Sequence, residues 1–372
     1  MALKPINSGE LLLHVGVHKT GTTAVQSALA DARADLAERG ITYPGASTFQ
    51  HRAVLAGAGR AFGWQDAQPE DISRAEWDAL VKQAKGTAVI SSEFFDDLDL
   101  DTARRMVEDL GGQARVRVVI TLRPIGAILP SAWQQRLKTG YGATYSHFLK
   151  QVFADELSTR GRKFWYRHDQ VAQVHRWSEI VGPDRVYVVV IPEGDRTAIF
   201  SAFEGLLGLP DGFLAQRKVQ TQNRSMTAAE AEFVRQINKA VVDELSWEDY
   251  LRIVRRGLVL SMVEERRPEP DEAKIVTPKW AGRKAQEFGQ RFADGIAASG
   301  VNVIGDPNAL AAEPRTGKAD QADAVPMVAA VSGAVAAIRQ GATKKPSAAP
   351  ATAPSRREAL RILVKPRRFR AR

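Results

Sequence analysis

The chain contains no cysteine among its 372 residues. This absence excludes a disulfide framework, a thiolate nucleophile and a cysteine-ligated zinc site. Long hydrophobic runs are also absent, because no stretch reaches the roughly 18 uninterrupted apolar residues that a membrane-spanning helix needs. The Ala-rich stretch Val325–Ile338 is apolar but too short to span a membrane.

The N-terminal sequence, MALKPINSGELLLHVG, lacks the apolar core and the small-residue cleavage site of a signal peptide. We therefore expect a cytoplasmic protein. Hydrophobic residues make up 44% of the chain, enough for one large α/β domain with additions rather than a string of small modules.

Positive charge is confined to one end of the chain. The net charge is +9, and residues 307–372 hold 13 Lys and Arg against four Asp and Glu, whereas residues 1–306 hold 39 charges of each sign. A neutral body argues against specific nucleic-acid binding. The basic tail could contact nucleic acid, anionic lipid or another acidic surface, but its Ala-, Pro- and Ser-rich composition predicts a disordered segment.

Four short runs rich in Val and Ile predict β-strands that are covered on both faces. They are Leu11–Val17, Ala88–Ser92, Val116–Leu122 and Arg185–Ile191. Helical patterns separate them, which favours βαβ units. We therefore predict an α/β fold, a P-loop-like three-layer sandwich with a central, mainly parallel sheet flanked by helices.

Helical spacing of apolar residues predicts the helices between these strands. The predicted helices are about Ile72–Lys85, Thr23–Arg39, about His168–Val181 and Thr227–Asp243, the last with a capping box of Thr227 and Glu230. We expect one domain over residues 1–306, with a motif-bearing core at about 11–238 and a helical remainder at about 239–306. Residues 307–372 are the expected tail.

The segment GVHKTGTT directly follows the first predicted strand and opens the first helix. We call residues 16–23 the phosphate loop. A strand-to-helix turn of this kind aims backbone N–H groups and the positive end of the helix dipole at one point, and a lysine and threonine hydroxyls add to them. The expected phosphate contacts are His18, Lys19, Thr20, Gly21, Thr22 and Thr23.

The order of residues in the loop distinguishes it from the P-loop of nucleotide triphosphatases, in which a lysine follows the second glycine. Here Lys19 precedes Gly21. The loop resembles the 5′-phosphosulfate-binding loop of sulfotransferases that use 3′-phosphoadenosine 5′-phosphosulfate (PAPS). That resemblance implies PAPS as the sulfuryl donor and no required metal.

A second motif agrees with the first. In that family, an arginine after a later strand and a serine eight residues on hold the 3′-phosphate of the nucleotide. Arg123 follows the predicted strand Val116–Leu122, and Ser131 lies eight residues later. Independently of the family, an arginine at the carboxyl end of a strand can bind a phosphate through two parallel hydrogen bonds. We expect Ser131 in the first turn of the next helix.

The resemblance covers roughly Leu11–Asn238 and includes the stretch Gly40–Gly45, which is similar to a Gly-Ile-x-Tyr-Pro stretch of bacterial members. One departure is clear, because the RKGxxGDWK segment of the cytosolic small-molecule enzymes is missing. Asn223-Arg224-Ser225 is the candidate for a loop in its place. The absence of an N-terminal anchor separates the chain from the Golgi-type relatives of this family, so we expect a bacterial cytoplasmic enzyme.

The candidate general base is Glu93, at the end of the second predicted strand. In a parallel sheet this position lies beside the phosphate loop. The stretch resembles the glutamate-bearing segment of glycosaminoglycan-type sulfotransferases, which implies a carbohydrate acceptor. The flanking Phe94 and Phe95 offer apolar surroundings. His51 is the second candidate base, and His14 is interpreted as a core residue.

Two other functions remain open. The same cradle could serve an ATP-dependent kinase or nucleotidase, which the position of Lys19 and the lack of a clear Mg²⁺-binding aspartate after a hydrophobic strand disfavour. A non-catalytic scaffold that acts through its basic tail is the third reading. The intact set of candidate site residues disfavours it.

Overall fold

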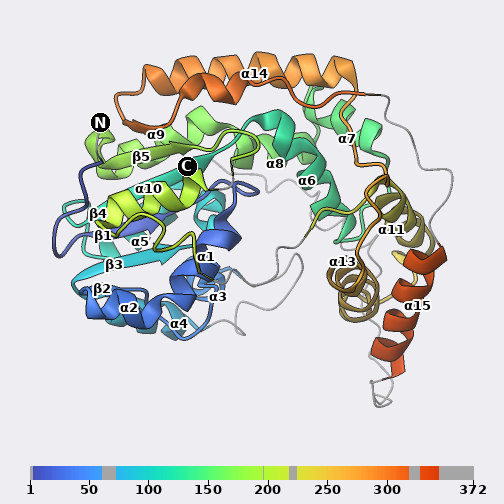
Figure 1. Cartoon of the computed structure of the whole chain (residues 1–372), viewed down its shortest axis with the longest axis horizontal. Coiled ribbons are helices and arrows are strands. Elements are labelled where there is room, and N and C mark those ends of the chain that lie inside the picture. The colour runs from blue at the N-terminus through green and yellow to red at the C-terminus, as the bar shows by residue number, and fades with distance from the viewer. Residues whose placement is uncertain (1–2, 61–72, 196, 218–223, 318–326, 343–372) are drawn as a thin grey trace, which may run out of the picture. The chain divides into compact units, whose positions relative to one another are not determined.

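The computed structural model describes residues 3–60, 73–195, 197–217, 224–317 and 327–342 (Figure 1). Its contacts divide the chain into two compact units. Unit 1 comprises Met1–Ala132, Ser146–Gln222 and Val276–Lys318, and unit 2 comprises Trp133–Tyr145, Asn223–Ile275 and Ala319–Arg372. The expected boundary between residues 306 and 307 stays a prediction.

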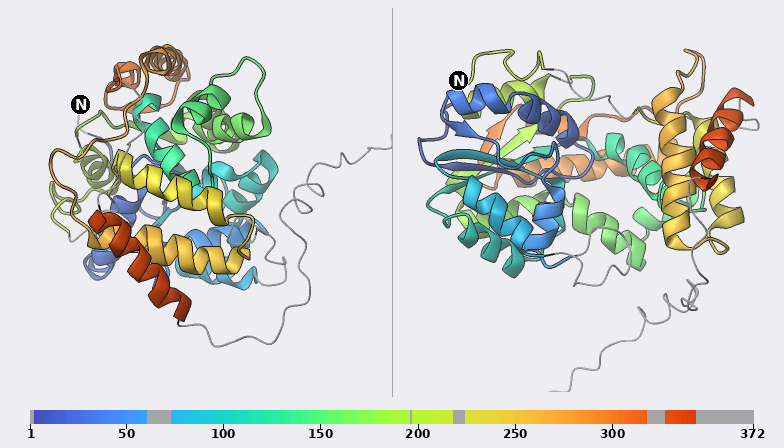
Figure 2. Two further views of the ribbon diagram at one scale, coloured as in Figure 1. Left: turned by 90° about the vertical axis from the view of Figure 1, so that its right-hand side faces the viewer. Right: turned by 90° about the horizontal axis from the view of Figure 1, so that it is seen from below.

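Unit 1 is built on a six-stranded sheet in the order β2-β3-β1-β4-β5-β6, in which every neighbouring pair is parallel. The strands are β1 Leu11–His14, β2 Ile41–Thr42, β3 Thr87–Ser91, β4 Val116–Leu122, β5 Val186–Val190 and β6 Asn302–Ile304. Helices cover both faces of the sheet (Figure 2). The predicted α/β fold with a central parallel sheet flanked by helices is confirmed.

Alternation along the strands explains why both faces need helices. In β1, Leu11 and Leu13 pack in one cluster with apolar residues of the helices His51–Gly57, Ala75–Gln83, Leu100–Asp109 and Gln170–Val181. Leu12 packs on the opposite face with apolar residues of the helices Thr22–Asp31, Arg33–Glu38 and Ala198–Leu207. All three leucines are buried. A continuous apolar run is therefore the expected pattern for such a strand, and the four predicted strands all occur, with β4 at the predicted bounds.

The helices of unit 1 connect the strands. They are α1 Thr22–Asp31, α2 Arg33–Glu38, α3 His51–Gly57, α4 Ala75–Gln83, α5 Leu100–Asp109, α7 Tyr145–Val152, α8 Thr159–His168, α9 Gln170–Val181, α10 Ala198–Leu207 and α14 Lys279–Ala297. The short 3₁₀ helices among the described residues of unit 1 are η2 Glu93–Asp97, η3 Pro183–Arg185 and η5 Pro307–Ala311. Helix α6, Ile125–Leu137, begins in unit 1 and ends in unit 2.

The helix predicted over Thr23–Arg39 is two helices, because the chain turns at Ala32 between α1 and α2. Arg33 stabilises the turn by donating from Nε to the carbonyl of Tyr43 at 3.1 Å and from Nη2 to the carbonyl of Ser47 at 2.8 Å. Sequence spacing did not reveal this break, because the apolar pattern continues through it.

Unit 2 is helical. Its elements are α11 Ala228–Val241, α12 Trp247–Asp249, the π-helix η4 Tyr250–Leu260, α13 Ser261–Glu265 and α15 Met327–Ala342. The predicted capping box is present, since Thr227 accepts from the N–H of Glu230 while the Glu230 carboxylate accepts from the N–H of Thr227. Arg224 and Arg266 neutralise the buried Glu230 carboxylate at 2.6 and 2.7 Å.

The structure differs from the predicted disorder over two stretches of residues 307–372, which form η5 and α15. Alanine has the highest helix propensity of all residues, and six of the 16 residues of α15 are alanine. The composition that suggested a disordered tail therefore also suits a helix once it has a surface to pack on. Residues 343–372 lie outside the described residues.

None of the helices in the described residues has both the length and the apolar character to cross a membrane.

Candidate functional site

The candidate site lies where the order of strands reverses. Strand β1 is central, with β3 on one side and β4 on the other, so the three segments that follow these strands emerge at the same edge of the sheet. In parallel sheets this switch point is the usual place for a ligand. The segments carry the phosphate loop after β1, Glu93 after β3 and Arg123 after β4.

The backbone of the phosphate loop turns sharply. Gly16, Lys19 and Gly21 have φ values of 61°, 73° and 96°. Glycine adopts such angles freely, but Lys19 is the non-glycine residue with positive φ among the described residues. A residue held in a backbone conformation that costs free energy is a reason to expect a functional role at that position.

The first turn of α1 is suited to bind an anion. Its N-cap residue is Gly21, which offers no side-chain cap, and its first turn holds no acidic residue. By contrast, Asp99, Ser158 and Asp169 cap α5, α8 and α9 with their side chains. The hydroxyl oxygen of Thr22 is buried and has no hydrogen-bond partner in the structure. An anion that accepted hydrogen bonds from this turn would satisfy groups that otherwise lack a protein acceptor.

Glu93 lies against the phosphate loop, as its position after β3 predicts. A β-carbon placed on Gly16 would be 3.2 Å from the β-carbon of Glu93 and 3.0 Å from the hydroxyl oxygen of Thr22. Gln26 on α1 donates from Nε2 to the Glu93 carboxylate at 3.3 Å and to the carbonyl of Ser91 at 2.9 Å. Residue 16 must therefore be small, and the carboxylate is held next to the loop.

Arg123 reaches the same loop from β4. Its Nη1 donates to the carbonyl of Lys19 at 3.2 Å, and its own carbonyl accepts from Nε2 of Gln170 at 2.7 Å. Ser131 lies in the second turn of α6, not in the first turn as predicted, because the helix already begins at Ile125. The residue after Arg123 is Pro124, which suits a position just before a helix.

A buried polar chain supports the loop from below. In His14, Nδ1 lies 2.8 Å from Oγ of Ser91 and Nε2 lies 3.2 Å from Oγ1 of Thr121. Oγ1 of Thr121 in turn lies 2.6 Å from Oγ1 of Thr20. Thr20 also donates to the carbonyl of Val17 at 2.7 Å. The predicted core role of His14 is confirmed, and the chain joins β1, β3 and β4 to the loop.

We expect acid to destabilise the protein through His14. Burial lowers the pKa of His14 to about 3. The unfolded chain therefore binds a proton near pH 6.5 that the folded chain refuses until about pH 3, so the free energy of unfolding falls as pH drops between these values, by about 1.4 kcal/mol per pH unit. Chemical denaturation from pH 7 to pH 4.5 should show a steeper loss for the wild type than for His14→Asn. Parallel curves would contradict this assignment.

His18 contacts two carboxylates next to the loop. The backbone N–H of His18 donates to Oδ2 of Asp96 at 3.0 Å. Its ring atom Nε2 lies 3.4 Å from Oδ1 of Asp96 and 3.6 Å from Oδ2 of Asp97. Arg167 binds both oxygens of Asp97, at 2.5 and 2.7 Å. These contacts fix the residue before Lys19 to the 3₁₀ helix that begins with Glu93.

Charge within this cluster favours the protonated ring of His18. Burial opposes the imidazolium, but the Asp96 and Asp97 carboxylates outweigh it and raise the pKa of His18 above its ordinary value. Burial raises the pKa of Asp96. The ligand atoms of the three residues lie within 4.8 Å of one another, a spacing that could also hold a metal ion. The Arg167 guanidinium already supplies a cation to Asp97, and the expectation of a metal-free site stays a prediction.

His51 begins α3 on the other side of Phe94. The Phe94 ring centroid is 5.5 Å from that of His18 and 5.8 Å from that of His51. Burial lowers the pKa of His51, against the opposing charge of Glu93, so its ring is neutral at pH 7 and can accept a proton. Phe95 points away from the site, since it is fully buried between Trp77 and Trp177. Only one of the two flanking phenylalanines therefore faces the histidines.

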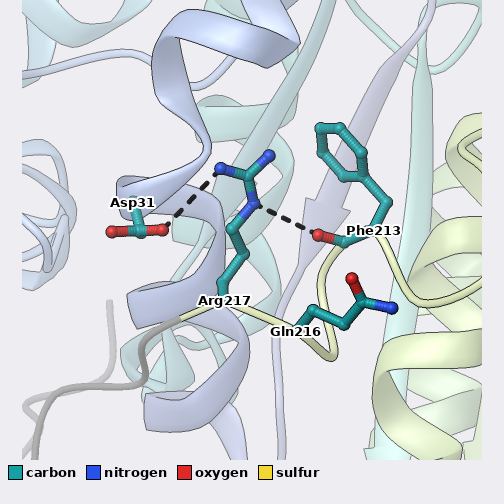
Figure 3. Close-up of a pocket in the computed structure, with 4 residues that line it drawn as sticks. All are labelled: Asp31, Phe213, Gln216 and Arg217. Carbon is teal, nitrogen blue, oxygen red and sulfur yellow. Dashed lines mark hydrogen bonds and ion pairs between the residues drawn. The ribbon is translucent and has the colours of Figure 1, made fainter.

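A hollow of about 500 Å³ lies elsewhere on unit 1, lined by Asp31, Phe213, Gln216 and Arg217 (Figure 3). Asp31 ends α1, about 15 Å along the helix from the phosphate loop. Arg217 is paired with Asp31 at 3.8 Å and with Asp35, and it stacks on the Phe213 ring. Its charge is therefore already balanced, and the hollow is not part of the candidate site.

Sequence reasoning missed several residues of the site. Gln26, Asp96, Asp97 and Thr121 act on the loop or on Glu93, but none of them stands in a recognisable motif. The signals available were the two aspartates that follow Glu93 and the helical position of Gln26, one turn after the loop. For the proposed closing loop, Asn223 lies outside the described residues, and Arg224 is bound to Glu230 within unit 2.

Comparison with known proteins adds one similar structure. No protein-family model matches the chain, and no curated protein matches it in sequence. The crystal structure of a sulfotransferase from Alicyclobacillus acidocaldarius is 16% identical to it, over 66% of this chain and 95% of that one, with a TM-score of 0.37.

Proposed function

We propose that the chain is a PAPS-dependent sulfotransferase that transfers a sulfuryl group to a hydroxyl or amine of a carbohydrate. One observation carries the proposal: the phosphate loop, Glu93 and Arg123 come from three different strands and meet at the switch point of the sheet. The order of Lys19 and Gly21 in the loop, which differs from that of a P-loop, supports PAPS over a nucleoside triphosphate.

The residues divide into two binding groups. The N–H groups of the first turn of α1, the Thr22 and Thr23 hydroxyls and Lys19 would hold the 5′-phosphosulfate. The orphaned Thr22 hydroxyl and the uncapped helix fit such an anion. Arg123 and Ser131 would hold the 3′-phosphate.

The chemistry follows from this placement. The acceptor oxygen or nitrogen attacks the sulfur in line with the bond to the 5′-phosphate oxygen, a new bond to sulfur forms, and the sulfur–oxygen bond breaks to leave adenosine 3′,5′-bisphosphate. Lys19 stabilises the charge that develops on the departing oxygen. The carboxylate of Glu93 accepts the proton that the acceptor loses.

The first test is calorimetric titration with adenosine 3′,5′-bisphosphate, with AMP and ATP plus Mg²⁺ as controls. We expect micromolar binding of the bisphosphate and much weaker binding of AMP, because AMP lacks the 3′-phosphate. In Arg123→Ala the affinity should fall about tenfold or more, which corresponds to about 1.4 kcal/mol. Arg104→Ala, on a surface arginine that pairs with Glu179, should bind as the wild type does.

The same titration tests the other functions. Preference for ATP with Mg²⁺ would support the kinase or nucleotidase, for which Asp96 and Asp97 beside the loop are the available carboxylates. Absence of binding by any nucleotide would support the scaffold and remove the basis for the proposed sulfotransferase.

A further inference from the structure

Helix α15 of unit 2 exposes an apolar stripe. Of the four large hydrophobic side chains that are exposed among the described residues, three lie on this helix. They are Val331, Val335 and Ile338, which are 51%, 40% and 69% exposed. Spacings of four and three residues place them on one face of a helix.

The opposite face of α15 is used for packing. Ala329, Gly333 and Ala336 are buried there, and they are small enough to let the helix approach η4 closely. A β-carbon on Gly257 of η4 would lie 3.0 Å from Cα of Ala337, and one on Gly333 would lie 3.1 Å from Cγ of Leu258. Figure 1 shows α15 beside α13, which it also contacts. Because the small residues face inward, the larger ones are left to face solvent.

Strong positive charge follows this stripe in the sequence. Residues 343–372, directly after α15, contain ten Lys and Arg and one Glu. Apolar residues alternate with these cations in RREALRILVKPRRFRAR. Nucleic acid would account for the cations but leave the apolar residues without a partner, whereas an anionic lipid surface accommodates both at once.

We propose that the C-terminal region binds an anionic membrane surface, with the α15 stripe in contact with the lipid and the basic residues after it paired with lipid phosphates. The helix lies on the membrane and does not cross it, since its 16 residues include Arg339 and fall short of a span. This property is separate from the proposed transfer reaction and is measured without it.

The test is co-sedimentation of the full-length protein with vesicles. We expect binding to phosphatidylcholine vesicles that contain about one third phosphatidylglycerol, at least tenfold weaker binding to pure phosphatidylcholine, and a decrease as salt is raised. Two variants should each reduce binding at least tenfold: Val331→Ser with Val335→Ser and Ile338→Ser, and Arg367→Gln with Arg368→Gln, Arg370→Gln and Arg372→Gln. Since the stripe is exposed, the first variant should keep the wild-type melting temperature.

A matched control removes four exposed charges elsewhere, by glutamine substitution of Lys82, Lys85, Arg283 and Lys284. It should bind vesicles as the wild type does. The proposal is overturned if anionic vesicles bind no better than neutral ones, or if the serine variant binds them normally, which would leave an acidic partner such as nucleic acid. It is also overturned if the serine variant changes the mass in sedimentation equilibrium, because a second copy would then cover the stripe.

Discussion

Replacing Lys19 with glycine is expected to lower the rate of sulfuryl transfer from PAPS by a factor of about 10² to 10³ while the protein stays folded. In the proposed mechanism, the loss follows from removal of the ammonium that would stabilise charge on the departing phosphate oxygen. The fold should tolerate the change, because φ at this residue is 73°, a conformation that glycine adopts without strain. Release of adenosine 3′,5′-bisphosphate from PAPS in the presence of a mixture of carbohydrates measures the effect.

Lys19→Ala is the matched variant, because it removes the same charge and keeps the strain. Both variants should lose activity to a similar extent, but only the alanine variant should retain the cost of a left-handed residue with a β-carbon, about 1 kcal/mol. Lys85→Ala, on an exposed lysine, should be fully active. An active glycine variant would mean that Lys19 matters only for the shape of the loop.

Glu93→Gln is expected to lower kcat by a factor of about 10² to 10⁴, the usual range for loss of a general base. The substitution keeps the size of the side chain and its contact with Gln26, so binding of adenosine 3′,5′-bisphosphate should change little. Measurement of kcat alongside calorimetric affinity separates the two effects.

His51→Asn distinguishes the second candidate base. If Glu93 accepts the proton, this variant should lose much less activity than Glu93→Gln, since His51 only lies near the carboxylate. The reverse order of losses would make His51 the base. If Glu93→Gln and His51→Asn both lost only a little activity, neither residue would be the general base of the proposed mechanism.

The fold could be predicted largely from the sequence because of one physical property of its strands. Strands covered on both faces are apolar throughout, and four such runs were visible, with β4 found at its predicted bounds. The strands β2 and β6 were missed because they have only two and three residues, too few to form a pattern. The break at Ala32 was missed because it is held by Arg33 contacts to residues ten and more positions away.

The candidate site was partly predictable for a related reason. The carboxyl ends of parallel strands lie at one edge of the sheet, so motifs that directly follow such strands are expected close together. Gly16, Glu93 and Arg123 could be assigned to the candidate site in this way. Residues that support the loop from other elements had no such signal. Thr121, Asp97 and Arg167 act through contacts that only the folded chain creates, over about 70 to 100 residues of sequence.

The central place of β1 in the sheet also determines when the site can form during synthesis. The phosphate loop is synthesised before β3 and β4, but β1, which it follows, pairs with both of these later strands. Pairings between residues so far apart in sequence form slowly, because a long chain must first be closed into a loop. A nascent chain shorter than about the end of β4 therefore carries the loop sequence without the assembled candidate site. In the proposed function, binding of the nucleotide can assist folding only after Arg123 has been made.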